Sequence, residues 1–438
     1  MSGTPHIKSL SVATETTFGS INPLTGLPDA VAVGLLSYTS LECERAPIMV
    51  AGEAPVDERP DTRTGFYVHA PEANTACDVN GNPIPRRTGQ IQIDQVVTMI
   101  GAATTFANYG VHPIGQMLNA VLRYSAPLGA SSDPVVGAVS GTLFTATDPT
   151  KFTVGGMICQ PQAGVGNYSF VTGIAGPTIT TSPAMTSPPS GDMRIGSTFT
   201  TATQFIELGA SLSFRGDGDG FRWYAVGCRP SALNITTTPH MVKFSWTIEC
   251  AHIFDDNFSA QVTAGVNIVD PVIADGCAAH MLQTISSVSM ADVRGVSSPA
   301  AEAKTDLVVD EFSASLSWTL GARGTAATPI GIADYEVTDF VCDVDILTSI
   351  ETPALTQDTF LKRELHSLIV GLSNVSTGNG LCIYLPAAAL QADPNVLDLG
   401  GDIIKYRYLF KQSGPWTGDT ASGSSSPGGK PFRIGLGN

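Results

Sequence analysis

The sequence predicts a mainly β fold with a few helices. We expect a duplicated β-sandwich or barrel module with a flanking helix, plus a small inserted β-module. Residues 242–251 alternate apolar and polar side chains, a period of two that places each set on its own face of a sheet. A second pair of strands with the same plan is expected at 378–411. The composition agrees, because only 14% of the 438 residues are charged while 45 are glycine and 29 are proline.

The first copy is expected to begin with a strand at 90–100 and a helix at 112–124. Pro113 suits the first turn of that helix, where its missing N–H costs nothing. One face of the helix is apolar at the spacing i, i+3, i+4, i+7 and i+8, which predicts that it packs on the core. That face consists of Ile114, Met117, Leu118, Val121 and Leu122.

A hairpin at 218–253 completes the first copy. We expect its strands at 221–228 and 242–253, with a loop at 229–240 between them. The apolar face of the second strand consists of Val242, Phe244, Trp246, Ile248 and Cys250. Its polar face consists of Lys243, Ser245, Thr247 and Glu249.

The second copy repeats the order strand, helix, hairpin at 335–347, 356–370 and 378–411. This order indicates an internal duplication, although the two copies do not share residue identities. In the second helix we expect Thr356 or Thr359 as the cap, Gly371 as the stop, and an apolar face made of Leu361, Leu365, Leu368 and Ile369.

This plan divides the chain into four parts. The first module comprises 1–130 and 201–255, and the second comprises 256–411. Short apolar runs between closely spaced Gly, Pro and Asp predict that 131–200 is a small β-module inserted into the first one. The Gly/Ser-rich tail at 412–438 is expected to be flexible or to dock on a neighbour.

A long polar segment at 51–88 leads into the strand at 90–100. A loop of this length is uncommon in a compact domain and is usually functional, so we interpret it as an arm that contacts a partner. Its candidate contact residues are Glu53, Asp57, Glu58, Arg59, Asp61 and Arg63.

Charge and cysteine content restrict the partners. The formal charge of −16 argues against tight nucleic-acid binding, which needs clustered Lys and Arg. The sequence shows neither an N-terminal signal segment nor an apolar run long enough for a bilayer, so we expect a soluble protein made in a cytoplasm, without a membrane partner. The eight cysteines form no Cys-x-x-Cys pair and are expected to be reduced thiols.

Sequence motifs for catalysis, cofactors and metals are missing. There is no Gly-x-Ser-x-Gly elbow, no His-Glu-x-x-His and no dinucleotide-type glycine loop. The stretch 423–430, GSSSPGGK, departs from a phosphate loop because Gly429 replaces the lysine and Pro431 replaces the Ser/Thr. We therefore expect no catalytic, cofactor-binding or metal-binding residues, and predict that the protein is not an enzyme.

The run Arg-Gly-Asp-Gly-Asp-Gly at 215–220 has two interpretations. Asp217 and Asp219 could bind Ca²⁺, or the first three residues could bind an integrin-type receptor. A hairpin turn explains the run better, because Asp-Gly is a favoured turn pair and the second copy carries Thr-Gly-Asn-Gly at 377–380 without a carboxylate.

Other notable side chains also have structural explanations. The seven histidines include no helical pair with a carboxylate, and we expect them at the surface or with satisfied hydrogen bonds. Trp223 and Trp246 lie in strand patterns, and we expect them to pack in the core rather than to stack against a sugar. Asp343 and Asp345 are expected on the solvated face of a strand.

Several stretches resemble the tail tube proteins of long-tailed bacteriophages. The opening at 12–28, VATETTFGSINPLTGLP, resembles the start of these proteins, the TETTFG part especially. Further similar stretches are KFTVGGMIC with ITTSPAM in the inserted module, WYAVGCRPSALNI at 223–235 and PIGIADYEVTDF at 329–340.

The resemblance implies a structural virion protein, located in the virion tail and, during assembly, in the host cytoplasm. Tube modules of this family pack six to a ring, and the rings stack into a hollow tube for the genome. Two modules in one chain imply a homotrimer with pseudo-sixfold symmetry, and one module implies a homohexamer. The implied partners are further copies, other tail proteins and DNA in transient passage, with no cofactor.

The same resemblance assigns expected roles to two sets of residues. The long arm at 51–88 occupies the position of the family's loop that contacts the adjacent ring. The polar face of the 242–253 strand, with Lys243, Ser245, Thr247 and Glu249, becomes the candidate channel wall.

Two other classes of function are compatible with the sequence. A carbohydrate-binding adhesin or another cell-surface β-protein fits the β-rich composition and the many Ser and Thr residues, and glycan binding by a monomer would support it. A hydrolase on a β scaffold is supported only by carboxylates whose placement the sequence does not show.

Overall fold

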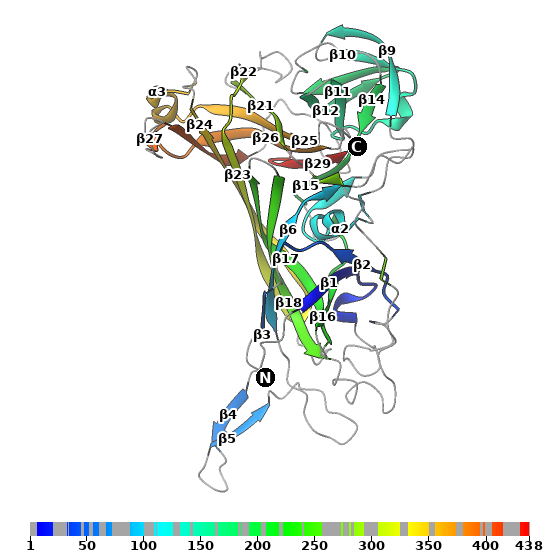
Figure 1. Ribbon diagram of the computed structural model, residues 1–438, viewed down its shortest axis with the longest axis vertical. Coiled ribbons are helices and arrows are strands. Elements are labelled where there is room, and N and C mark those ends of the chain that lie inside the picture. Colours follow the sequence, from blue (N-terminus) through cyan, green and yellow to red (C-terminus); the bar gives the residue numbers. More distant parts are fainter. Residues whose placement is uncertain are drawn as a thin grey trace.

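The fold is mainly β, which confirms the predicted fold class (Figure 1). In this computed structural model the described residues are 7–20, 33, 35–44, 48–51, 56–60, 67–71, 88–99, 109–110, 112–125, 132–140, 143–162, 165–182, 185, 192–202, 207–218, 222–238, 241–255, 273–274, 280–281, 284–292, 305–324, 332–349, 355–373, 380–394, 397–398, 405–414 and 430–437.

A long antiparallel sheet, upright in Figure 1, uses strands from both halves of the chain. Its order is β3 (Ile48–Ala51), β6 (Gly89–Val96), β18 (Met241–Asp255), β17 (Arg222–Thr238), β23 (Glu311–Gly324), β24 (Ile332–Thr348) and β28 (Lys405–Gly414). The pairing of β17 with β23, from Ala232↔Ser317 to Thr236↔Ser313, joins the first half to the second. We call this ladder the long sheet.

The first half covers the long sheet with strands and one helix. The N-terminal part of β17 pairs with β16 (Leu212–Gly218), followed by β1 (Ile7–Thr14) and β2 (Tyr38–Leu41), with the short β19 (Ile273–Ala274) beside β2. Helix α2 (Pro113–Asn119) contacts β1, β2, β17 and the short β8 (Arg123–Ser125). Its apolar residues share one core with Phe244 and Trp246.

The second half covers its part with strands. β26 (Gly380–Leu390) pairs with β28 and with β25 (Leu365–Ser373), and β25 continues to β21 (Thr284–Asp292) and β22 (Thr305–Asp306). The last strand, β29 (Arg433–Gly437), lies between β26 and β15 (Ser197–Thr200), which pairs with β8. The two-residue β27 (Leu397–Asp398) flanks β28.

A closed barrel of six short strands occupies 132–195, within the part of the sequence expected to be an inserted module. It consists of β9 (Ser132–Ser140), β10 (Leu143–Ala146), β11 (Met157–Gln162), β12 (Val165–Ala175), β13 (Thr178–Ser182) and β14 (Asp192–Ile195), with the 3₁₀ turn η2 (Pro149–Lys151). The barrel is inserted between the paired strands β8 and β15, yet it packs on β21, β25 and β29. A shared cluster joins Phe170 of the barrel to Tyr384 of β26.

Two short strand pairs complete the described fold. β4 (Val56–Pro60) pairs with β5 (Tyr67–Pro71), and this hairpin lies at the lower end in Figure 1, apart from the other labelled strands. β7 (Thr98–Met99) pairs with β20 (His280–Met281). Within the described residues no helix has the length and apolar character that a membrane crossing needs.

The repeated order of elements reappears as a repeated strand order. In the first half the strands run β6–β18–β17, and in the second half they run β24–β28–β26, all antiparallel. In the first copy β6 pairs with β18, and in the second copy β24 pairs with β28. In both copies the first strand thus pairs with the second of the two strands that follow the helix. The division into modules with defined boundaries stays a prediction.

The predicted first helix is present but shorter. It ends at Asn119 because Ala120 forms the cap and residues 123–125 form β8. All five residues of its predicted apolar face are buried. His112 caps the helix, since its Nδ1 accepts from Ile114 N at 3.4 Å, and Pro113 occupies the first turn.

The predicted second helix at 356–370 is wrong for most of its length. Only α3 (Gln357–Leu361) is helical, and Arg363, with a φ of 50°, ends it. The rest forms β25, whose residues from His366 to Ser373 are all buried. An apolar run that is buried on both sides fits a strand as well as a helix. For this reason the spacing of Leu361, Leu365, Leu368 and Ile369 predicted a helix where the chain mostly forms a strand.

Two further expectations are corrected. The expected loop at 229–240 is strand through Thr238, with a bulge between Pro230 and Ala232 that accommodates the proline. The expected flexible tail at 412–438 is wrong at both described ends, because β28 runs to Gly414 and β29 is fully buried. The described cysteines are free thiols, in agreement with the expectation.

Candidate functional site: the polar face of the long sheet

The long sheet presents one face of short polar and charged side chains. In an antiparallel ladder, residues directly opposite each other lie on the same face, so the register defines this set. We call it the polar face. Its polar members are Gln90, Gln92 and Asp94 of β6, Lys243, Ser245, Thr247 and Glu249 of β18, Asn234 and Thr236 of β17, Glu311, Ser313, Ser315 and Ser317 of β23, Asp343 and Asp345 of β24, and Lys405, Arg407 and Lys411 of β28. The register places five apolar residues among them, namely Val96, Ala232, Val341, Leu347 and Leu409.

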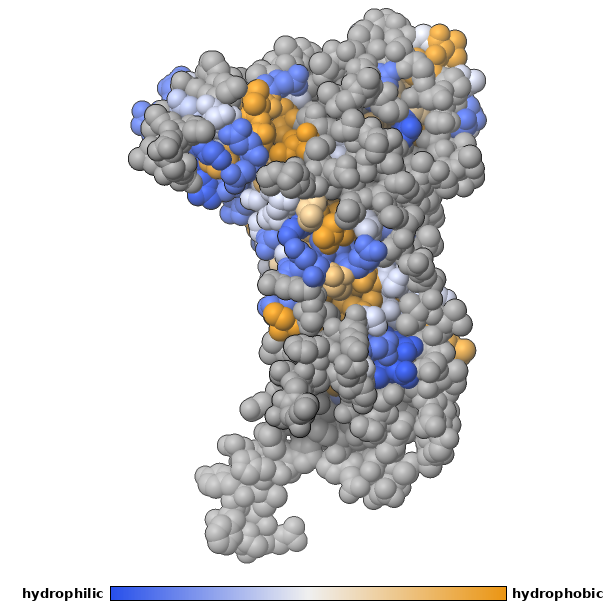
Figure 2. All heavy atoms as spheres, in the orientation of Figure 1, coloured by the Kyte–Doolittle hydropathy of each residue, from blue (hydrophilic) through white to orange (hydrophobic). Residues whose placement is uncertain are grey.

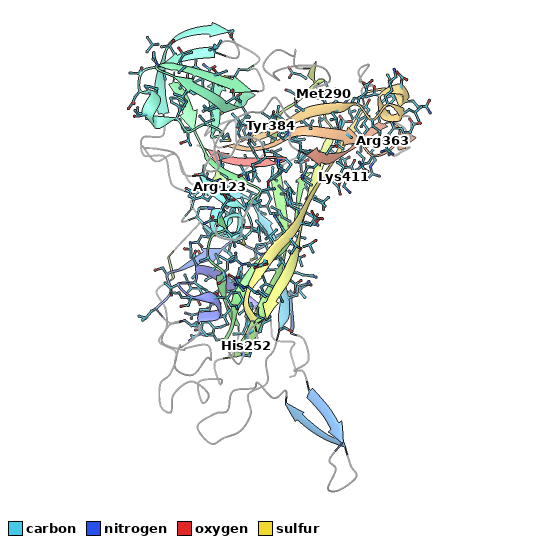
Figure 3. All side chains as sticks on the ribbon, turned by 180° about the vertical axis from the view of Figure 1, so that it is seen from behind. Arg123, His252, Met290, Arg363, Tyr384 and Lys411 are labelled. Carbon is cyan, nitrogen blue, oxygen red and sulfur yellow. The ribbon has the colours of Figure 1, made fainter. Side chains whose placement is uncertain are left out.

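One row shows how the two halves are combined. Starting at β6, it runs through Asp94, Ser245, Asn234, Ser315, Asp343 and Lys411. Lys411 lies where the long sheet meets the upper strands (Figure 3). Because each strand contributes one residue to the row, the polar surface continues without a break across the seam between β17 and β23.

The four predicted residues of β18 lie together on this face and are half-buried. Lys243 forms an ion pair with Glu44, and Ser245 Oγ donates to Asp94 Oδ1 at 2.6 Å. Glu249 Oε1 accepts from Gln90 Nε2 at 2.8 Å. These side chains point away from α2, which packs on the apolar face with Phe244 and Trp246.

The cations of the polar face lie beside carboxylates. Arg407 Nε donates to both Asp345 oxygens at 3.0 Å, and Lys405 Nζ contacts Glu311 Oε1 at 2.9 Å. Lys411 is directly opposite Asp343 in the register. This arrangement gives DNA phosphates few sites to hold, because tight phosphate binding needs clustered cations that are not already neutralised.

The sequence predicts the β18 part of this face, and it separately predicts that Asp343 and Asp345 of β24 lie on the solvated face of a strand. The polar residues of β23 alternate with buried ones such as Phe312 and Leu316, and that alternation could have extended the prediction. The contribution of β17 was missed because 229–240 was interpreted as a loop. The pairing of β17 with β23 has no local sequence signal.

The structure describes only part of the expected inter-ring arm. Asp57, Glu58 and Arg59 lie in β4, opposite Ala70, His69 and Val68 of β5. Glu53, Asp61 and Arg63 lie outside the described residues. The hairpin is separate from the polar face, so the two predicted sets are not brought together.

The stretch TETTFG, which carries the resemblance most clearly, has a structural role here. Glu15 is buried and accepts hydrogen bonds from Gly19 N at 2.9 Å, Ser211 Oγ at 2.5 Å and Gly227 N at 3.1 Å. Phe18 packs edge-on against Tyr335 of β24, with ring centroids 6.1 Å apart. This segment therefore ties β1 and β17 to the second half.

Asp217 lies in β16, directly opposite Arg222 of β17, and the connection between these two strands lies outside the described residues. It accepts from Arg222 Nε at 2.8 Å across the β16–β17 pair, and from Arg215 Nη2 at 3.1 Å. Asp219 lies outside the described residues. Among the residues that the structure describes, no group of three or more His, Cys, Asp or Glu side chains is placed to hold a metal ion.

The tryptophans in strands are core residues. Trp223, Trp246 and Trp318 are all less than 5% exposed, so none of them offers a face to a sugar. The surface view in Figure 2 shows hydrophobic atoms at the upper right, over the barrel. The chain matches no protein-family model and no curated protein sequence.

Proposed function

We propose that this chain is a structural virion protein, a tail tube protein of a long-tailed bacteriophage, whose rings stack into a channel for the genome. The observation that carries the proposal is the continuous long sheet. It has one face sealed by a hydrophobic core and one face on which Ser, Thr, Asn, Gln and balanced charges predominate, contributed by both halves of the chain. The stretches that resemble the family support the same conclusion.

The chemistry of the polar face suits passage of a polyanion. Ser, Thr and Asn side chains hydrogen-bond to water, and the cations are engaged by neighbouring carboxylates such as Asp345 and Glu311. A wall of this kind attracts phosphates weakly, so DNA is not retained by long-lived contacts.

Edge pairing between copies would close a ring. At one edge of the long sheet, β3 pairs only with Gly89–Gln92 of β6. Farther along β6, among the described residues, Asp94 O accepts a single backbone hydrogen bond from Glu44 N on that side. An edge of this kind aggregates unless a neighbour covers it. A partner strand from a second copy would cover it.

Electron microscopy of the purified protein, alone and with other tail components, tests assembly. The expected result is rings or tubes with a central channel. A persistent monomer under all these conditions would contradict the proposal.

The lining of the channel has its own test. The double substitution Asn234→Lys with Ser317→Lys would add two cations to the polar face. The residues directly opposite these positions are not acidic, since they are Ser245 and Ser315 for Asn234, and Ala232 and Val341 for Ser317. We expect tubes of this variant to retain DNA in a salt-dependent way in a filter-binding assay, whereas wild-type tubes do not. The matched control is Val136→Lys with Ala175→Lys, which adds the same charge to exposed positions of the barrel. Equal retention by both variants would place the polar face outside the channel.

A glycan-binding module is the alternative, and it lacks an aromatic platform among the described tryptophans. Binding of the monomer on a glycan array, together with absence of rings, would favour that alternative.

A further inference from the structure

Two cysteines of the long sheet lie side by side. Cys228 of β17 and Cys250 of β18 are directly opposite each other in the register, and both are free thiols that are at most 1% exposed. The other described cysteines in strands are opposite residues of other types, as Cys342 is opposite Leu316. Among the cysteines that the structure describes, this pair is therefore the one whose two members face each other across a ladder.

A backbone hydrogen bond of β18 shows which kind of pair this is. Val242 O accepts from Val97 N, which follows β6, so Val242 directs its backbone groups toward β6. Backbone groups point to alternate sides along a strand, and the register of β18 with β6 is unbroken from 243 to 250. Cys250 therefore also points its N–H and C=O toward β6. With Cys228 of β17 it forms a non-hydrogen-bonded pair, the kind whose side chains approach most closely.

The spacing of such a pair suits a disulfide bond. Its Cα atoms are about 4.5 Å apart, and disulfides join Cα atoms about 4.4–6.8 Å apart. The two thiols already interact, since burial and a hydrogen bond with the Cys250 thiol raise the pKa of the Cys228 thiol well above its usual value. Both belong to the main core cluster, together with Leu212 and Ile248, and a disulfide brings no hydrogen-bond donor into these apolar surroundings.

We propose that Cys228 and Cys250 are an oxidation site, at which a peroxide converts the two thiols into a cross-strand disulfide. One thiolate attacks an oxygen of hydrogen peroxide, the O–O bond breaks, and a sulfenic acid and hydroxide form. The second thiolate attacks the sulfenic sulfur, the S–S bond forms, and the S–O bond breaks. Each hydroxide takes up one proton from a thiol, so two thiols and one peroxide give one disulfide and two water molecules.

This inference goes beyond the proposed function and does not depend on it. Both cysteines belong to one chain, so the bond forms in a single protein whether or not rings assemble. Its failure would leave the tube proposal untouched, and a failure of the tube proposal would leave the oxidation site untouched.

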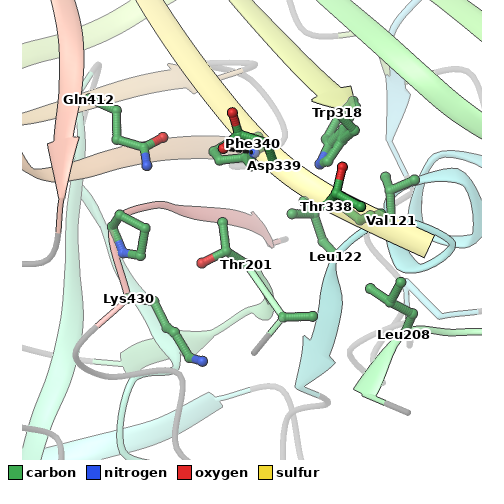
Figure 4. Close-up of a pocket in the computed structure, with 13 residues that line it drawn as sticks. Val121, Leu122, Thr201, Leu208, Trp318, Thr338, Asp339, Phe340, Gln412 and Lys430 are labelled. Carbon is green, nitrogen blue, oxygen red and sulfur yellow. Dashed lines mark hydrogen bonds between the residues drawn. The ribbon is translucent and has the colours of Figure 1, made fainter. Parts of the chain in front are cut away.

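Burial makes the site slow to react. Neither cysteine is among the described residues that line the cavity of about 400 Å³ beside β23 and β24, such as Leu122 and Trp318 (Figure 4). This cavity therefore gives an oxidant no direct path to the sulfurs, and the peroxide enters when the strands open locally. The raised pKa slows the reaction further at neutral pH, because the thiolate is the nucleophile. The pair stays reduced in a reducing cytoplasm and is oxidised during long exposure to peroxide.

The bond closes a loop that contains much of the polar face. Between 228 and 250 lie Asn234 and Thr236 of β17, and the β18 residues Lys243, Ser245, Thr247 and Glu249. Closing a loop stabilises a protein mainly by restricting the unfolded chain. We therefore expect the oxidised protein to unfold at a higher temperature, with the hairpin at 228–250 more protected than the rest.

The main test treats the full-length protein with hydrogen peroxide for increasing times, and then labels all remaining thiols with N-ethylmaleimide in denaturant. Peptide mapping without a reductant should show one link, between the peptides with Cys228 and Cys250, while Cys342 is fully labelled. The link should form faster as the pH is raised and should disappear with dithiothreitol. Unlinked Cys228 and Cys250 after the longest treatment, or links of either one to other cysteines, would refute the proposal.

Two variants separate the bond from other effects of peroxide. Cys250→Ala removes one partner, and Cys342→Ala removes an equally buried cysteine of β24. Peroxide should raise the melting temperature of wild type and of Cys342→Ala by a few degrees, and hydrogen exchange within 228–250 should slow. Cys250→Ala should show neither change, and an equal rise in all three proteins would overturn the assignment. If a variant does not fold, the peptide map of wild type decides.

Discussion

The two halves of the chain build the same strand order and cover it differently. Behind β6–β18–β17 lies helix α2, packed through its buried apolar residues. Beyond β26 the ladder continues into β25 and β21, the barrel packs on these two strands, and the short α3 lies at the surface. The same strand order is therefore compatible with a helix in one half and with further strands and the barrel in the other. These different neighbours determine which side chains each half exposes.

The largest expected effect concerns a buried ion pair between the halves. Arg229 of β17 is 1% exposed, and its Nε and Nη2 bind Asp334 of β24 at 2.8 and 3.0 Å. It also donates to the carbonyls of Gly209 and Ala120, the latter at the end of α2. Arg229→Met should lower the free energy of unfolding by about 3–5 kcal/mol, because Asp334 loses its partner.

Urea unfolding followed by circular dichroism measures this loss. Arg222→Met is the control, since its ion pair with Asp217 is about a quarter exposed and should contribute less than about 1 kcal/mol. Equal losses in the two variants would show that Arg229 does not join the halves.

The cover of the first half also predicts a pH dependence. Burial lowers the pKa of His112 from 6.5 to about 4, so folding favours its neutral form. The unfolded chain then binds more protons between these values, and stability falls as the pH decreases from 6.5 to 4. The loss is roughly 3 kcal/mol at about 1.4 kcal/mol per pKa unit.

His112→Asn tests this assignment, because asparagine can cap the helix without titrating. We expect a smaller slope of unfolding free energy against pH in the variant than in wild type over this interval. Parallel curves for the two proteins would remove His112 as the cause.

The cover of the second half is sensitive at its contact with the barrel. A Cβ at Gly380 of β26 would lie 1.9 Å from Tyr168 Oη of the barrel. Gly380→Ala should force Tyr168 away and destabilise the docked barrel by about 1–3 kcal/mol.

Hydrogen exchange in 157–170 and thermal unfolding measure this effect. Gly137→Ala is the matched control, because a Cβ at that position of β9 meets no atom within 4 Å. In a Tyr168→Ala background the cost of Gly380→Ala should shrink, and a full cost there would point to another cause.

The smallest expected effect concerns the face that the halves share. Asp345→Asn removes the partner of Arg407, whose side chain is 53% exposed. An exposed ion pair contributes less than about 1 kcal/mol and is screened by salt. Denaturation at low and high salt should show a difference from wild type that disappears at high salt, and a larger, salt-independent loss would indicate a structural role.

These differences between the halves explain which elements of the fold could be predicted from the sequence. The strand β18 was predicted with the correct face because its two sides meet water and core, which leaves a period of two in the sequence. The helix α2 was found because a surface helix shows a single apolar stripe. β25 was missed because both of its sides are buried, with the barrel packed on it, and the apolar run within it at 368–372 has no period of two.

The candidate site was only partly predictable for a different reason. Alternation identifies a face within one strand, and it contains no information about which strand lies beside it. The join of Asn234 to Ser315 depends on pairing between residues that are distant in the sequence. A proline at 230 also concealed a strand that a bulge makes possible.

The position of β29 makes the contact between the barrel and the second half depend on a third segment of the chain. Arg433–Gly437 pairs on one side with β15 and on the other with β26, and Arg433 lies over the rings of Phe170 and Tyr384. One strand therefore supplies backbone partners to both sides of this contact. If β29 detaches, β15 and β26 lose their hydrogen bonds together, so we expect the barrel and the second half to separate in one step.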